Sequence, residues 1–346
     1  MNATSRLVLV ASLGLCAAAA LAASAPQAGY RVLHRYTPGG DQGWDYLAVD
    51  AAARRVYVSH GDEVVVLEAD GGKTVGRIGQ LHGVHGIALA PAMHRGWISN
   101  GRSGEVTVFD TRTLKPTATL KATGANPDAI LYDPASDRVF TFNGRSDDAT
   151  AFDAASGKTL PTIALPGKPE FAVSDGAGHV WANIEDKNEL VELDPKAAKV
   201  LATWSLAPCE SPSGLALDAA HRRLFSVCDN RTMTVLDADD GHRVATVAIG
   251  NGPDAAAFDS RRGLVYSSNG QDGTLTVVRE DDPNHYRVLA TVPTQATART
   301  LALDPHTGHL FLSAAQFAAH TEQGGPHHHP SVLPGSFTVL EVGRSP

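Results

Sequence analysis

Seven polar or charged residues recur at intervals of 40 to 45 positions, each just before a short apolar segment. These ring residues are Asp45, His85, Asp128, Glu170, Ser213, Asp254 and Arg299. Neighbouring carboxylates repel one another, so a bound cation or a basic ligand group would stabilise the set if the fold gathers it. Carboxylate oxygens suit Ca²⁺, Mg²⁺ or Mn²⁺, and an added imidazole also allows Zn²⁺. We expect ligand contact at all seven positions, and the expected metal ligands are Asp128, Glu170, Asp254 and His85.

Three further residues are candidate ligand contacts. Trp44 stands where four other units carry proline, which would stiffen the segment before the polar residue. A later turn in three units is an Asn-Gly pair, which is ordinary tight-turn chemistry, whereas two units have His60 and Glu185 there. These two residues depart from the turn pattern, so we expect them to contact the ligand. A second interpretation stays open, in which the polar residues only face water.

The ring residues follow an internal repeat of four strand-like segments. The first unit contains segments 46–50, 54–60, 64–69 and 73–78, and later units repeat this order. The seventh unit lacks a fourth segment, but residues 30–33, ahead of the first unit, have its character. Four strands per unit of about 42 residues is typical of a propeller blade. The sequence predicts one all-β domain over residues 29–343, a seven-bladed β-propeller whose ring is closed by the N-terminal strand pairing into the last blade.

This architecture places the ring residues together. The innermost strand of each propeller blade runs beside a central channel, and each ring residue comes just before or at the start of such a strand. The polar positions of all seven units should therefore meet at one mouth of the channel.

The chain also resembles a known family. The strand motifs YVSHG from Tyr57 and ISNG from Ile98, and the runs NPDAILYDP from Asn126 and ESPSGLALD from Glu210, are similar to those of the YncE-like group of YVTN-repeat β-propellers. The resemblance covers nearly the whole chain after the leader described below. It implies an exported seven-bladed propeller and does not fix an activity, because propellers serve as enzymes, binders and scaffolds alike.

The last unit has a long loop, residues 316–335, with a run of histidines at His327, His328 and His329. Connections longer than about 12 to 15 residues in a compact domain are usually functional or disordered. The predicted topology places this loop at the channel mouth, where it could act as a lid. The histidine run is an alternative metal site, and a solvated loop without a ligand is the competing interpretation.

The N-terminal residues indicate export. Residues 1–22 combine Arg6, an apolar stretch and a small-residue cleavage pattern, which is typical of a signal peptide, with cleavage at 22 or as late as 25. No later segment could span a membrane. Two cysteines remain after removal of the leader, Cys209 and Cys228, and an oxidising compartment favours a disulfide between them. We expect a periplasmic or secreted monomer.

The composition narrows the function. The formal net charge of −8 disfavours nucleic-acid binding, and the sequence has no Walker, HExxH, GxSxG or haem-attachment motif. We expect a protein that binds a metal ion or a small polar or cationic molecule at the acidic channel mouth. The alternatives are an enzyme at the same site, with metal-assisted lyase or lactonase-like chemistry and His85 as the best catalytic candidate, or a scaffold for a periplasmic protein. The cofactor is not identified beyond a possible divalent metal ion.

Overall fold

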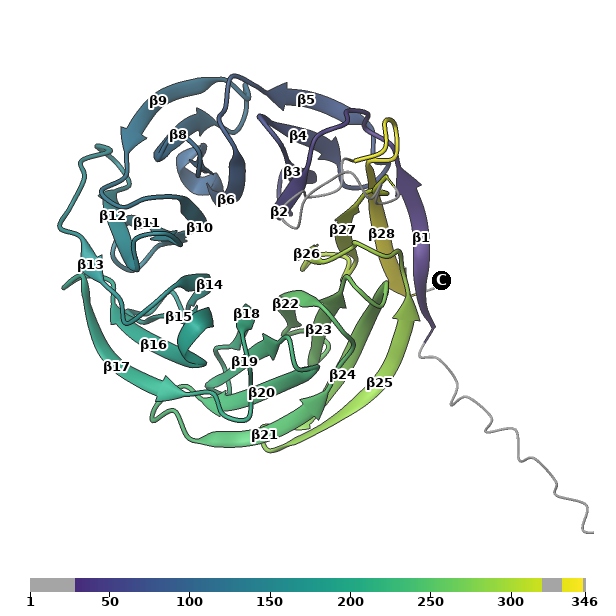
Figure 1. Ribbon diagram of the computed structural model, residues 1–346. Coiled ribbons are helices and arrows are strands. Elements are labelled where there is room, and N and C mark those ends of the chain that lie inside the picture. The colour runs from purple at the N-terminus through teal and green to yellow at the C-terminus, as the bar shows by residue number, and fades with distance from the viewer. Residues whose placement is uncertain (1–28, 319–331, 345–346) are drawn as a thin grey trace, which may run out of the picture.

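The computed structural model describes residues 29–318 and 332–344, which form seven four-stranded antiparallel sheets around a central axis (Figure 1). The predicted seven-bladed propeller is confirmed. In each of the first six blades, the strands run outward from the axis in chain order.

The strands of the first three blades are β2 (Trp44–Asp50), β3 (Arg55–His60), β4 (Glu63–Glu68) and β5 (Thr74–Ile78); β6 (Val84–Ala90), β7 (Arg95–Asn100), β8 (Glu105–Asp110) and β9 (Pro116–Lys121); β10 (Pro127–Asp133), β11 (Arg138–Asn143), β12 (Asp148–Asp153) and β13 (Ile163–Ala164). The next three blades consist of β14 (Pro169–Ser174), β15 (Val180–Ile184), β16 (Glu189–Asp194) and β17 (Lys199–Ser205); β18 (Pro212–Asp218), β19 (Arg223–Cys228), β20 (Thr232–Asp237) and β21 (Arg243–Ala248); β22 (Pro253–Asp259), β23 (Leu264–Asn269), β24 (Thr274–Asp282) and β25 (His285–Pro293). Two 3₁₀ turns, η1 (Pro91–Met93) and η2 (Glu185–Lys187), are the helical segments of the described chain.

The seventh blade is built from both ends of the propeller domain. Its order is β26 (Thr300–Leu303), β27 (Leu310–Ala314), β28 (Thr338–Arg344) and β1 (Tyr30–Tyr36). β1 pairs antiparallel with β28, from Tyr30 opposite Arg344 to Tyr36 opposite Val339. This pairing, visible on the outer side of the blade in Figure 1, confirms the predicted closure. It gives β28 a partner on both sides and so removes an exposed sheet edge.

Apolar packing between neighbouring blades holds the ring together. Seven hydrophobic clusters of the described residues occupy the seven blade interfaces. The middle strands carry most of this core, and all five residues of β15 are buried. Trp97 and Trp181, each at most 1% exposed, are the largest side chains within it. Because both faces of every blade are covered, the axis and its lining residues are held on a rigid frame.

Arginines connect the blades on the face opposite the ring residues. Arg138 donates to the Pro195 carbonyl at 2.7 Å, and Arg223 donates to the Pro283 carbonyl at 2.8 Å. Each bond joins the start of a second strand to a turn of the next blade. These guanidinium groups are therefore engaged within the protein and help to join neighbouring blades.

Cys209 and Cys228 form the predicted disulfide, with Cα atoms 5.5 Å apart. Cys209 precedes β18 and Cys228 ends β19, so the bond links two loops of one blade. Both residues are buried. The bond braces the segment that leads to Ser213 at the channel. No helix of the described residues has the length and apolar character needed to cross a membrane.

Candidate functional site

The ring residues occupy one structural position in the propeller. Six of them are the second residue of the innermost strand of a blade, and Arg299 directly precedes β26. In all six strands the register with the neighbouring strand shifts at this residue, as between Pro127 and Ile130 of β10. A β-bulge re-aims side chains at the end of a sheet. The repeated bulge explains why six side chains of different chemistry all face the axis.

A layer of buried polar side chains fixes the backbone of the ring from below. Several of these side chains come from one blade and donate to a carbonyl of the next blade. Such bonds are Ser99 to Asp128 (2.5 Å), Asn183 to Ser213 (2.9 Å) and Thr300 to Asp45 (2.7 Å). The layer satisfies carbonyls that the bulges leave without a ladder partner, and it sets the position of each ring residue relative to its neighbour.

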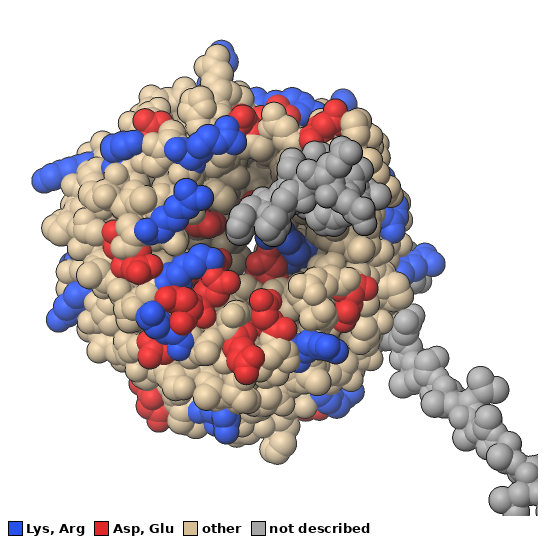
Figure 2. Space-filling view, viewed as in Figure 1, with Lys and Arg blue, Asp and Glu red and all other residues tan. Residues whose placement is uncertain are grey.

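All seven ring residues line a single cavity of about 780 Å³ at the channel mouth, which we call the acidic cavity. Figure 2 shows Asp and Glu side chains gathered around the central hollow of this face, with a few Lys and Arg side chains among them. The tilted contact between Tyr46 and Phe171, whose ring centroids are 5.3 Å apart, joins opposite sides of the channel. The prediction that the fold gathers these positions is confirmed in this geometric sense. Binding of a ligand there stays a prediction.

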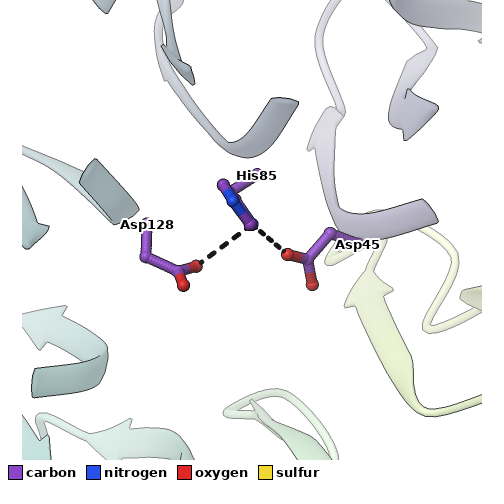
Figure 3. Close-up of side chains that lie close together, drawn as sticks. All are labelled: Asp45, His85 and Asp128. Carbon is purple, nitrogen blue, oxygen red and sulfur yellow. Dashed lines mark hydrogen bonds and ion pairs between the residues drawn. The ribbon is translucent and has the colours of Figure 1, made fainter. Parts of the chain in front are cut away.

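His85 lies between two carboxylates at the mouth (Figure 3). Its Nδ1 is 2.7 Å from Asp45 Oδ2 and 3.6 Å from Asp128 Oδ1. Burial by itself would lower the pKa of His85, but the hydrogen bond to Asp45 and the charge of Asp128 outweigh it, so the pKa is raised. The three residues come from the first three blades, and their potential ligand atoms lie within 4.8 Å of one another.

This triad differs in part from the expected metal set. His85 and Asp128 belong to it, Asp45 joins them, and Glu170 and Asp254 lie outside it. A metal at this point would take the place of the hydrogen bond between His85 and Asp45. An imidazole with two carboxylates suits Zn²⁺ or Mn²⁺ better than Ca²⁺, which takes six to eight oxygen ligands.

Arg299 pairs with acids on both of its sides. Its guanidinium is 2.6 Å from Asp254 and 3.5 Å from Asp45, and it also donates to the Trp44 carbonyl at 3.2 Å. Although burial works against the charge, these two carboxylates raise the pKa of Arg299 above its ordinary value. Arg299 therefore neutralises only the side of the ring next to the seventh blade.

Lys168 is a cavity residue that sequence reasoning missed. Its Nζ contacts Glu170 at 2.6 Å and also contacts Glu185. Lys168 precedes the proline that stiffens the start of β14, two positions before Glu170. Its signal in the sequence was a basic residue that only this unit carries at that position. Asp229, which follows the second cysteine, also lines the cavity and was missed.

Burial and the charges of neighbouring carboxylates both oppose ionisation of the carboxyl groups in the cavity. Burial, followed by the charge of Asp128, raises the pKa of Glu170 to about 8 despite the nearby lysine. Burial also raises the pKa of Asp128 and of Asp254 to about 6, even though His85 and Arg299 respectively act in the opposite direction. Among the described residues, six carboxyl groups line the cavity, against two permanent cations, Lys168 and Arg299. At neutral pH, protons or a bound cation must offset part of the excess negative charge.

Of the three other candidate ligand contacts, the structure places two in the acidic cavity and one outside it. Trp44 and Glu185 line the acidic cavity. His60 does not, because it is 1% exposed and its ring stacks on Phe337 with centroids 4.0 Å apart. Burial lowers the pKa of His60, which favours a neutral imidazole. The histidines 327–329, most of the 316–335 loop and the leader lie outside the described residues.

Comparisons with known proteins identify the architecture alone. No family model matches this sequence, and no curated protein matches it. Solved structures do match. U3-55K has 10% identity and a TM-score of 0.71, over 90% of this chain and 98% of that one. The WD40 repeats of RRP9 have 10% identity and a TM-score of 0.71, over 91% and 98%. The hydrazine synthase of Kuenenia stuttgartiensis has 14% identity and a TM-score of 0.69, over 79% and 92%. At these identities the likeness supports the propeller fold and says nothing about the chemistry of the site.

Proposed function

We propose that this chain is an exported propeller, related to the YncE-like group, that binds a small cationic molecule or a divalent metal ion in the acidic cavity. The observation that carries the proposal is the excess of carboxyl groups over cations among the residues that line one cavity. A protein stabilised only by its own contacts would gain by replacing such groups, because burying unpaired carboxylates costs free energy. Their presence together is explained if a cation completes the site.

The raised pKa values support a coupling between the cation and protons. Near pH 7 the Glu170 carboxyl, with a pKa of about 8, holds its proton for most of the time. A cation bound beside it favours the ionised form and lowers that pKa. Binding should therefore release protons to solvent, and this signature would not arise at a cavity that merely holds water.

Export is supported by the predicted signal peptide at residues 1–22 and by the Cys209–Cys228 disulfide. Disulfides persist mainly in oxidising compartments such as the periplasm. Mass spectrometry of the secreted chain tests this part, because cleavage after residue 22 or as late as residue 25 gives a defined mass. Recovery of an intact N-terminus from the periplasm would contradict it.

Catalysis at the same site is the second candidate, favoured by the hydrogen bond between His85 and Asp45. A carboxylate that holds one imidazole nitrogen can orient the ring for general acid-base work. A scaffold is favoured less. Of the five large apolar side chains exposed in the described residues, Val75, Leu201 and Val288 lie on the outer strands of three separate blades. They do not form one apolar surface of the kind that marks a protein partner.

Elemental analysis and thermal unfolding test the proposal. The mature protein is purified without chelators, beside Asp128→Asn/Asp254→Asn and a control pair, Asp239→Asn/Asp240→Asn, on the opposite face. Because Asp240 could itself bind a metal together with Asp237 and His242, Glu68→Gln is a second control outside every such cluster. Near-stoichiometric metal that is absent from the ring variant and present in Glu68→Gln would identify a metal site. Without metal, stabilisation of the wild type and the control, but not the ring variant, by millimolar cadaverine would identify an amine site. No metal, and no stabilisation by cadaverine, Mn²⁺, Zn²⁺ or Ca²⁺, would overturn the proposal.

A further inference from the structure

A second cavity of about 590 Å³ adjoins the acidic cavity at the channel mouth, and we call it the arginine cavity. The two share four residues, namely Trp44, Asp45, His85 and Arg299. The remaining lining of the arginine cavity comes from turns of the first three blades. It consists of Gly43, Gly61, Gly83, Val84, Gly101, Arg102, Asn126 and Arg145.

The charge of the arginine cavity is opposite to that of its neighbour. Asp45 is the one carboxylate among its described lining residues, and it already contacts His85 and Arg299. Against it stand three guanidinium groups and the imidazole of His85. Burial works against the charge of this imidazole, but the hydrogen bond to Asp45 and the charges of Asp128 and Asp45 together raise its pKa. One half of the channel mouth therefore attracts cations and the other half attracts anions.

Arg145 carries a guanidinium group that has no side-chain partner among the described residues. It lies in the turn between β11 and β12 and is exposed. Its guanidinium makes no hydrogen bond or ion pair with any residue that the structure describes. Arg102, by comparison, lies 3.4 Å from Asp62, and Arg299 is engaged by Asp254. A guanidinium fork binds a carboxylate through two parallel hydrogen bonds, so Arg145 is the most available group for an anionic part of a ligand.

Trp44 lies at the boundary of the two cavities. Its residue is 8% exposed, and its indole Nε1 has no hydrogen-bond partner among the described residues. A buried indole N–H normally finds an acceptor. Trp44 lines both cavities, so its side chain forms part of the wall that they share.

The turn glycines keep space around these groups. A Cβ at Gly101 would lie 2.6 Å from His85 Nε2, and a Cβ at Gly83 would lie 3.1 Å from Arg102 Cβ. Side chains at these positions would crowd the imidazole and the arginine. The Asn100-Gly101 pair, which is also ordinary tight-turn chemistry, thus leaves room beside the ring residues.

We propose that the ligand is dipolar, with an ammonium group in the acidic cavity and a carboxylate against Arg145 in the arginine cavity. This inference rests on the proposed function and narrows it to one ligand class. A simple α-amino acid holds its two charges only two bonds apart, whereas Glu170 lines only the acidic cavity and Arg145 lines only the arginine cavity. The class that fits is therefore a basic amino acid, or the C-terminal basic residue of a peptide, whose side-chain ammonium is separated from its carboxylate.

Lysine and cadaverine test the proposal as a matched pair, because they differ only in the carboxylate. Calorimetric titration should show lysine binding about tenfold or more tightly than cadaverine, in keeping with a hydrogen bond between charged groups. Arg145→Gln should remove this preference without weakening the binding of cadaverine, which has no carboxylate for Arg145 to bind. Arg112→Gln, an exposed arginine that lines neither cavity, is the control and should keep the preference. Nα-acetyllysine distinguishes a free amino acid from the C-terminus of a peptide as the ligand. It should bind like lysine if the site takes a peptide C-terminus, and much more weakly if the site takes the free amino acid.

The outcomes separate this inference from the function on which it rests. Equal affinity for lysine and cadaverine in the wild type would overturn the dipolar ligand and leave cation binding intact. If the wild type binds Mn²⁺ or Zn²⁺ but neither lysine nor cadaverine, the dipolar ligand is likewise overturned and cation binding is left intact. A lysine preference that survives in Arg145→Gln would overturn the role of Arg145. Absence of binding by every probe would overturn the proposed function and this inference together.

Discussion

Replacing Glu170 by Gln should stabilise the ligand-free protein at neutral pH. The pKa of Glu170 is about 8 in the folded protein, because of burial and then the charge of Asp128, against an ordinary value of 4.5. Below pH 4.5 the folded and unfolded states both hold the proton, so the side chain costs nothing there. As the pH rises, the unfolded chain loses the proton and the folded protein keeps it, so the free energy of unfolding falls until about pH 8.

The magnitude follows from linkage. Each pH unit between the two pKa values costs the folded state about 1.4 kcal/mol, so the penalty at pH 7 is about 3 kcal/mol. Gln resembles the protonated carboxyl and carries no such penalty. With an unfolding entropy of about 2 cal/mol/K per residue, 3 kcal/mol corresponds to a rise in Tm of about 5 °C for a domain of this size.

Thermal unfolding followed by circular dichroism at pH 4.5 and pH 7 measures this effect in metal-free buffer. Glu170→Gln should match the wild type at pH 4.5 and exceed it at pH 7. Glu68→Gln, an exposed acid at the end of β4, is the control and should follow the wild type at both pH values. If Glu170→Gln is equal to or less stable than the wild type at pH 7, the ion pair with Lys168 outweighs burial and the reasoning is refuted.

Three further predictions concern the same face of the propeller. Cation affinity should rise between pH 5 and pH 8, because Asp128 and Asp254, each with a pKa of about 6, and then Glu170 become ionised; a flat affinity profile in calorimetry would contradict this. Gly101→Ala should weaken cation binding several-fold, since the added Cβ would meet His85 Nε2 at 2.6 Å, whereas Gly71→Ala, which has open space around its Cβ, should not. Replacing both cysteines by serine should lower the free energy of unfolding by about 3 kcal/mol or less, as expected for a bond closing a loop of this length; unchanged denaturant midpoints with and without reductant would contradict that prediction.

The fold could be predicted because its repeat consists of local sequence patterns. Alternating strands and turns recur in a fixed order, and the match of residues 30–33 to a missing fourth strand led directly to the pairing of β1 with β28. The disulfide was predicted on other grounds, because two cysteines left in an oxidising compartment tend to pair. The repeat also identified the ring residues, because six of them occupy the same bulge of their own strands and Arg299 directly precedes the innermost strand of the seventh blade.

The contacts within the site could not be predicted, because they depend on side-chain reach across the channel. No local pattern joins Asp45 with His85 and Asp128, and none places Lys168 between Glu170 and Glu185. For His60 the sequence predicted a ligand contact that the structure does not support. His60 occupies a turn position next to the channel, yet the apolar Phe337 from the last blade covers it, and no local pattern reports a contact between residues so distant in sequence.

Calorimetric titration at pH 7, in two buffers with different enthalpies of ionisation, tests the central claim most directly. Cadaverine, Mn²⁺, Zn²⁺ and Ca²⁺ are titrated separately into the wild type and into Asp128→Asn/Asp254→Asn. The account predicts that a cation binds the wild type with release of protons, and that it binds the variant at least tenfold more weakly. Binding that the variant leaves unchanged, or the absence of binding by all four cations, would contradict a cation site in the acidic cavity.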